Sequence, residues 1–221
     1  MELPSTSSKI SKTALRDLVY QRLHEMIENS RFSPGERINV EKLTAELGVS
    51  RTPVWQAVGL LEKEGLLTYN PYKGVFINKL SHRQAIDLYS VREVLECMAA
   101  ELSVNRIDAS VLERMRKILA KQEKVIRPPA DLVKYSKLDF DFHSEIYQAS
   151  GNEFLIELLD RIKNKMRPLV NHLEEILPDL VQDHLDVYNA LINHDAASAR
   201  ASFQRHNERM KEQITKNGED G

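Results

Sequence analysis

The placement of glycine is the feature that most limits how this chain can fold. The chain has 221 residues and eight glycines, and five of these fall between Gly35 and Gly74. Beyond residue 80, Gly151 is the single glycine before the last few residues. Glycine interrupts helices and supports tight turns. The sequence therefore predicts an N-terminal part made of short elements and a C-terminal part made of long helices.

Composition excludes several classes of protein. With 42% hydrophobic and 29% charged residues, the chain has the composition of a globular protein rather than a disordered one. Its longest apolar run, residues 97–100, is far shorter than the roughly 20 residues of a membrane span, and its polar start lacks the apolar segment of a signal peptide. The single cysteine, Cys97, has no partner for an internal disulfide. We therefore expect a mainly helical, cytoplasmic protein without a membrane partner.

The N-terminal part has the pattern of a winged helix-turn-helix. Apolar residues at three- and four-residue spacing predict helices over residues 13–29, 40–47 and from Ser50 or Thr52 to Gly65. Gly48 stops the second helix, and the tight turn that follows joins it to the third. Two apolar stretches, 66–69 and 75–77, flank turn residues and predict a pair of strands.

The third helix has one packing face and one polar face. Steps of 100° per residue place the apolar residues Val54, Val58 and Leu61 together. The opposite face consists of Thr52, Gln56, Gly59 and Lys63.

Recognition helices contact base edges mainly through their N-terminal residues, which here are Ser50, Arg51, Thr52 and Gln56. Arg51 suits a bidentate contact to guanine, and Lys73 in the turn between the strands suits a phosphate. Taken singly, Arg51 or Lys73 is equally well explained as an ordinary solvated charge that contacts no DNA.

Four segments of this region resemble the DNA-binding domain of the GntR family of bacterial transcription regulators. They are Pro-Gly-Glu-Arg at 34–37, Leu-Gly-Val-Ser-Arg-Thr-Pro-Val at 47–54, Leu-Glu-Lys-Glu-Gly-Leu at 61–66 and Lys-Gly at 73–74. The resemblance covers about residues 13–78 and implies that Gly74 joins Lys73 at the DNA. There is one departure, because Trp55 stands where the family usually has a DNA-contacting arginine. We therefore expect an operator that differs from the family norm.

The C-terminal part is predicted to be entirely helical. The expected helices cover residues 82–106, 109–126, 131–150, 153–177, 179–193 and 196–214, with breaks at Pro128-Pro129, Gly151 and Pro178. The predicted organisation is a disordered N-terminus over 1–12, a DNA-binding domain over 13–78, an all-helical domain over 79–215 and a frayed tail over 216–221.

Four ionisable side chains on three of these helices point toward the core. Asp139 and His143 lie in the middle of one apolar face, and His184 and His206 lie on the apolar faces of two other helices. One carboxylate and three neutral imidazoles form a good site for a divalent transition metal, with zinc and nickel as the leading candidates and manganese also open. The alternative is an Asp139–His143 ion pair and two unrelated core histidines.

The same residues resemble the FCD ligand-binding domain of the FadR branch of the GntR family, over about residues 81–215. The resemblance rests on Asp139-x3-His143, Ser150-Gly151-Asn152, His184 and His206. It implies a metal held by the Asp/His3 set, with a small carboxylic acid effector at its open positions. It also implies that Arg92, with Tyr89 beside it, reaches the effector carboxylate. Two alternatives stay open: Arg92 could pair with Glu96, and Asn152, a weaker effector contact, is also a good helix cap.

The resemblance implies a homodimeric, sequence-specific transcription regulator, most often a repressor, bound to double-stranded operator DNA. Effector binding at the metal pocket would lower operator affinity. A regulator that senses the metal itself would use the same residues. A metal-dependent hydrolase is a further alternative, since an open metal position can activate water, but the sequence shows no general base beside the four ligands.

Overall fold

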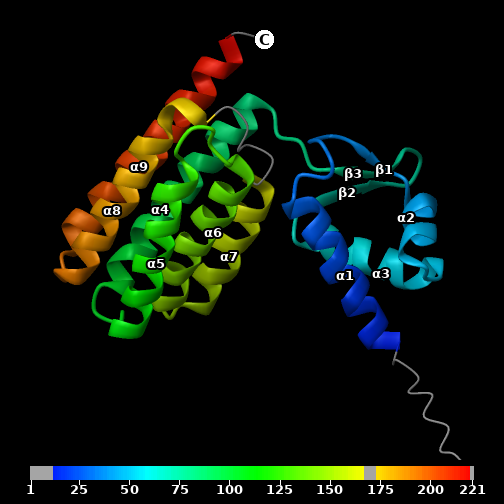
Figure 1. Cartoon of the computed structure of the whole chain (residues 1–221), viewed down its shortest axis with the longest axis horizontal. Helices are drawn as coiled ribbons and strands as arrows, with labels where there is room; N and C mark the ends of the chain where they lie inside the picture. The colour runs from blue at the N-terminus through cyan, green and yellow to red at the C-terminus, as the bar shows by residue number, and fades with distance from the viewer. Residues whose placement is uncertain (1–11, 167–172, 220–221) are drawn as a thin grey trace, which may run out of the picture. The chain divides into compact units, whose positions relative to one another are not determined.

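The computed structural model describes residues 12–166 and 173–219 (Figure 1). The chain divides into two compact units, with the boundary between Asn78 and Lys79. Residues 1–11, which were expected to be disordered, lie outside the described residues, whereas Lys12 already belongs to the first helix. Within the described residues, no helix is long and apolar enough to cross a membrane.

The first unit is a winged helix-turn-helix, as predicted. Its elements are α1 (Lys12–Glu28), β1 (Arg37–Ile38), α2 (Val40–Leu47), α3 (Arg51–Lys63), β2 (Leu67–Asn70) and β3 (Gly74–Ile77). The strands form an antiparallel sheet in the order β1-β3-β2, in which Arg37 pairs with Phe76 and Thr68 pairs with the same residue from the other side. Sequence analysis did not predict β1, because a two-residue strand is too short to show alternation.

The core of the first unit fixes which face of α3 is exposed. Val54, Val58 and Leu61 are at most 2% exposed and pack in one cluster with apolar residues of α1 and the sheet. This packing leaves Arg51 and Gln56 exposed on the opposite face. The predicted division of α3 into a packing face and a polar face is therefore present in the structure.

A glycine in the left-handed conformation closes the turn between α2 and α3. The α2 helix begins at the Asn39 cap, whose side chain accepts a hydrogen bond from the backbone N–H of Lys42 at 2.9 Å. It ends at Gly48, where φ is +64° and the backbone N–H donates to the carbonyl of Ala45. Glycine adopts this conformation without steric cost.

The second unit is a bundle of helices (Figure 1). Its elements are α4 (His82–Ser103), α5 (Ala109–Val125), α6 (Leu132–Ala149), α7 (Glu153–Met166), the 3-10 turn η2 (Glu174–Ile176), α8 (Leu177–Ile192) and α9 (Ala196–Glu219). The prediction of one helix over 153–177 is wrong, because residues 174–176 form the 3-10 turn η2 and Leu177 begins α8. Pro178 lies in the first turn of α8, where no backbone N–H is needed, so it starts that helix rather than separating two others.

The end of the chain also differs from expectation. The predicted last helix stops at residue 214, but α9 continues to Glu219, into the segment expected to be frayed. Residues 220–221 lie outside the described residues.

Two apolar clusters make up the core of the bundle. One surrounds Phe142, Ile146 and Tyr147 of α6, all of which are fully buried. The other contains Tyr89 of α4 and Tyr135 of α6 together with apolar residues of α7, α8 and α9. Because α6 contributes to both clusters, its inward-facing polar residues lie deep inside the bundle.

We expect the conformation of Gly48 to have a measurable cost when it is changed. A Cβ at Gly48 meets no atom within 4 Å among the described residues, so Gly48→Ala would suffer from its backbone conformation alone. Urea unfolding should show a loss of about 1 kcal/mol for Gly48→Ala and about half of that for Gly48→Asn, because asparagine tolerates this conformation better. Equal losses for the two variants would contradict this explanation.

Candidate metal and effector site and DNA-binding face

The structure brings the four predicted metal ligands together. Asp139 and His143 of α6, His184 of α8 and His206 of α9 each offer a ligand atom, and these atoms lie within 4.8 Å of one another. The three histidines are at most 2% exposed, and the Asp139 side chain is 17% exposed. The ring centroids of His184 and His206 are 4.8 Å apart, so these two are not unrelated core histidines.

Two neighbouring side chains set the orientation of two of the imidazoles. His143 Nδ1 lies 2.6 Å from Glu96 Oε1, and His184 Nδ1 lies 3.0 Å from Gln122 Oε1. Both oxygens are acceptors, so each Nδ1 donates its hydrogen to one of them, and the Nε2 side of each ring faces the cluster. The two Nε2 atoms are 3.2 Å apart, and they lie 3.7 Å and 3.4 Å from Asp139 Oδ1, respectively.

This arrangement suits a divalent cation. Burial, reinforced by the neighbouring histidines and Arg92, holds the pKa of His184 and His206 well below the usual range, so both rings are neutral at neutral pH. Burial raises the pKa of Asp139, against the opposing effect of His143. The two Nε2 atoms face one another at 3.2 Å, and Arg92 Nη2 also lies 3.2 Å from His143 Nε2. Moreover, His206 Nδ1 has no hydrogen-bond partner among the described residues. The donor set thus fits a transition metal that accepts imidazole and carboxylate ligands.

Glu96 connects this cluster to the rest of the bundle. Its carboxylate accepts hydrogen bonds from Arg92 Nε at 2.9 Å, from Asn207 Nδ2 at 2.7 Å and from the Tyr147 hydroxyl. Burial acts to raise the pKa of Glu96, but Arg92 and His143 outweigh it and hold the pKa well below its usual value. Glu96 is therefore ionised, and the pairing of Arg92 with Glu96 that the sequence left open is present.

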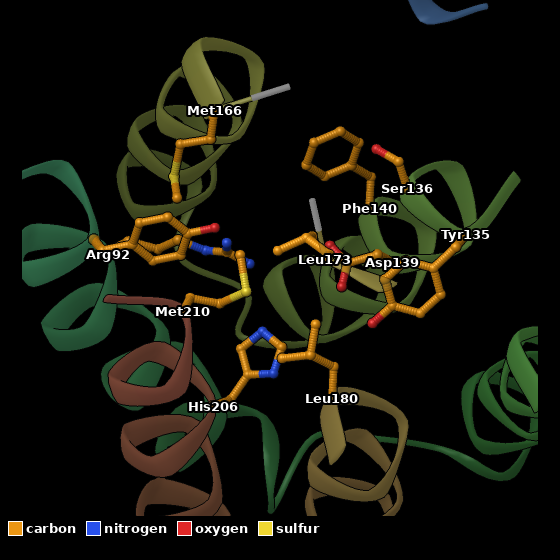
Figure 2. Close-up of a pocket in the computed structure, with 11 residues that line it drawn as sticks. Arg92, Tyr135, Ser136, Asp139, Phe140, Met166, Leu173, Leu180, His206 and Met210 are labelled. Atoms are coloured by element: carbon orange, nitrogen blue, oxygen red, sulfur yellow. The ribbon is translucent and has the colours of Figure 1, made fainter. Parts of the chain in front are cut away.

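A pocket adjoins the cluster (Figure 2). Figure 2 shows Asp139, His206 and Arg92 around it, so its polar side includes two of the four predicted metal ligands and one guanidinium. The remaining lining residues are mostly apolar or aromatic: Tyr89, Tyr135, Ser136, Phe140, Met166, Leu173, Leu180 and Met210. Arg92 thus takes part in the buried ion pair and also lines the pocket. In its chemistry, this lining suits a molecule with one negatively charged end and an apolar body.

Asn152, which was predicted as a weaker effector contact, is not among the residues that line the pocket. Its side chain accepts a hydrogen bond from the backbone N–H of Leu155 at 3.2 Å, at the start of α7. The helix-cap role that the sequence left open for Asn152 is therefore present. Sequence analysis also missed Gln122 and Asn207, because each is a neutral residue beside charged ones and reaches the site only through packing.

The residues predicted to contact DNA lie on one exposed part of the first unit. Ser50, Arg51, Thr52 and Gln56 are exposed, and the Ser50 side chain makes no capping hydrogen bond to α3. Arg51 pairs with Glu41 at 2.7 Å, but both side chains are at least 70% exposed. An ion pair this exposed contributes little and is readily exchanged for a contact to DNA.

The turn between β2 and β3 carries Lys73, which is exposed. The following Gly74 has a φ of +105°, and a Cβ there would lie 3.0 Å from Arg37 Nε. Gly74 therefore allows the close approach of Arg37, an exposed arginine of β1 for which sequence analysis predicted no role.

Two family models match the chain, one over each unit. A family model of the gntR family of bacterial regulatory proteins matches residues 15–77, and an FCD domain model matches residues 87–209, which is more than half of the chain. The HTH-type transcriptional regulator YdhC of Bacillus subtilis is 35% identical over 145 residues, which cover 66% of this chain and 65% of YdhC, slightly less than two thirds of its length.

Other relatives match over more of their length. A regulator in an unstable DNA locus of Streptomyces ambofaciens is 28% identical over 199 residues, covering 88% of this chain and 82% of the relative. Among solved structures, Escherichia coli McbR/YncC superposes with a TM-score of 0.80 over 92% of this chain and 98% of its own, at 22% identity, which shows a shared fold.

Glu96 provides a test of the buried network. Glu96→Gln would leave Arg92 with a buried charge and no carboxylate partner, so we expect it to lower the free energy of unfolding by about 3–5 kcal/mol in urea. The matched control is Glu93→Gln on the same helix, whose part-exposed ion pair with Lys211 should contribute less than about 1 kcal/mol. Similar losses for both variants would show that Glu96 does not hold the network together.

Proposed function

Because the chain belongs to the GntR family of bacterial regulatory proteins and carries an FCD domain, we propose that it is a repressor controlled by a small carboxylic acid bound at a metal site. A DNA-binding transcription regulator of this family is not an enzyme, so the metal-dependent hydrolase alternative is set aside. The observation that carries the proposal is the convergence of one carboxylate and three buried imidazoles at the wall of a pocket that Arg92 also lines.

In the first unit, α3 would enter the major groove of the operator. Arg51 would contact base edges, while Thr52 and Gln56 lie in the first two turns of the same helix and are also exposed. The uncapped N-terminus of α3 at Ser50 and the backbone beside Lys73 and Gly74 would contact phosphates. Two copies of the chain would bind two half-sites of a palindrome, spaced by about one helical turn.

In the second unit, Asp139, His143, His184 and His206 would hold the metal, with zinc or nickel favoured by the imidazole-rich set. When bound, the metal supplies a Lewis-acidic centre for an effector carboxylate oxygen. The protein's own residues orient this set: Glu96 and Gln122 each accept a hydrogen bond from the Nδ1–H of one histidine and so turn its Nε2 toward Asp139.

Arg92 and Tyr89 would position the effector. The Arg92 guanidinium carbon lies 5.5 Å from the centre of the Tyr89 ring, and both residues line the pocket. A carboxylate near Arg92 gains a charged hydrogen-bond donor, and its apolar body meets methionine and leucine side chains. Effector binding would then alter operator affinity by a coupling free energy of typically ~1–3 kcal/mol.

We expect about one transition metal ion per chain when the untagged protein is purified without chelator and measured by elemental analysis. His184→Ala should lose the ion, because one of the four converging ligands is gone, whereas His82→Ala should keep it, since His82 is exposed at the start of α4. Chelation should lower the Tm of the wild-type protein by about 5 °C or more, and the metal should restore it. Absence of metal even after addition of zinc or nickel would refute the metal site.

Replacing two charges on the first unit should separate base recognition from phosphate binding. For an operator selected from random duplexes, Arg51→Ala should cost ~1–3 kcal/mol and reduce the preference over random DNA. Lys73→Ala should weaken binding to both DNAs by a similar factor and lower the salt slope by about one. Fluorescence anisotropy at several salt concentrations measures both. Normal discrimination in Arg51→Ala would place the recognition surface elsewhere.

A further inference from the structure

An aromatic side chain stands out on the exposed face of α3. Trp55 is 40% exposed and lies one turn after Arg51 and Thr52, so it shares their face of the helix. Its ring meets Tyr69 of β2 edge to face, with the ring centroids 5.2 Å apart. The backbone N–H of Tyr69 in turn donates to Glu62 Oε1 at 3.0 Å, which ties β2 to α3. The indole is therefore supported from one side, while part of its apolar surface faces solvent.

Gly59, one turn beyond Trp55, has no explanation within the chain. It lies inside α3, its φ is not positive, and a Cβ built there meets no atom within 4 Å among the described residues. Neither the backbone nor the packing thus requires glycine. Because glycine is less favourable than alanine inside a helix, its presence on this face costs stability. A close approach by another molecule would account for it.

We propose that Trp55 recognises thymine in the operator, with its indole against the C5-methyl group, and that Gly59 lets α3 lie deep enough in the groove for this contact. The inference rests on the proposed DNA-binding function of this face. In the major groove, the thymine methyl is the apolar group that base edges present. Trp55 is the large apolar side chain among the polar residues Arg51, Thr52 and Gln56, and the two surfaces match in chemistry.

The methyl group can be removed without any other change to the DNA. The full-length protein is first used to select an operator from random duplexes, and each thymine is then replaced by uracil. We expect one position in each half-site where uracil weakens binding by about 3- to 10-fold, as for the loss of one buried methyl group. Trp55→Ala should bind the thymine and uracil operators equally.

Two further variants sharpen the test. Trp55→Arg should shift the selected base at that position from thymine to guanine, which arginine contacts in a bidentate manner. Tyr72→Ala is the matched control, because Tyr72 is an aromatic residue of the same unit that is 98% exposed in the turn between β2 and β3. It should keep the full difference between thymine and uracil.

Gly59→Ala tests the close approach separately. It should raise the Tm by about 2 °C, because alanine favours the helix, and should nevertheless weaken operator binding at least 10-fold. Unchanged binding of this variant would overturn the role of Gly59.

If no uracil substitution weakens binding, recognition of thymine by Trp55 is wrong, although a defined selected operator would still support the DNA-binding function. Failure to select any sequence would overturn both.

Discussion

A buried, ionised carboxylate holds the second unit together. Glu96 of α4 accepts hydrogen bonds from Tyr147 of α6 and Asn207 of α9, and it pairs with Arg92 on its own helix. An ionised carboxylate in a protein interior is tolerated only when such partners compensate for its lost hydration. The geometry of the site depends on this compensation, because the same carboxylate lies 2.6 Å from His143 Nδ1 and so orients that ring.

The candidate site is consequently built in two layers. The inner layer consists of Asp139 and the Nε2 atoms of His143 and His184, which lie between 3.2 and 3.7 Å from one another. The outer layer, Glu96 and Gln122, fixes the orientation of two rings. A metal ion held here would meet one carboxylate and imidazole nitrogens, beside the guanidinium of Arg92, whose Nη2 lies 3.2 Å from His143 Nε2. The pocket beside this set contains an arginine, so a bound anion would meet positive charge from the protein as well.

The first unit separates stability from recognition on a single helix. The packing face of α3 is apolar and fully buried, whereas its other face has an exposed arginine, an exposed tryptophan and a glycine. Changes on the exposed face can alter which DNA sequence is bound without disturbing the core. The replacement of a family arginine by Trp55 is of this kind, because the indole rests on Tyr69 and needs no change in the helix.

Much of this organisation follows from sequence pattern. Helical periodicity predicted that Asp139, His143, His184 and His206 face inward, and glycine placement predicted the winged unit and the helical unit. The pattern failed where no period exists, as in the two-residue strand β1. It failed also at the start of α8, since Pro178 can either end one helix or begin the next.

The sequence by itself thus determined the inward faces of α3 and α6, because apolar residues at helical spacing form a stripe that is stable only when it packs against other elements. Only the tertiary structure decided that Arg92 pairs with Glu96 while it also lines the pocket, that Gln122 orients His184, and that Asn152 caps a helix away from the pocket. Some of these contacts join side chains of different elements. Others show which of two possible local roles a residue such as Asn152 has. They depend on how the helices pack, and no periodicity in the chain encodes them.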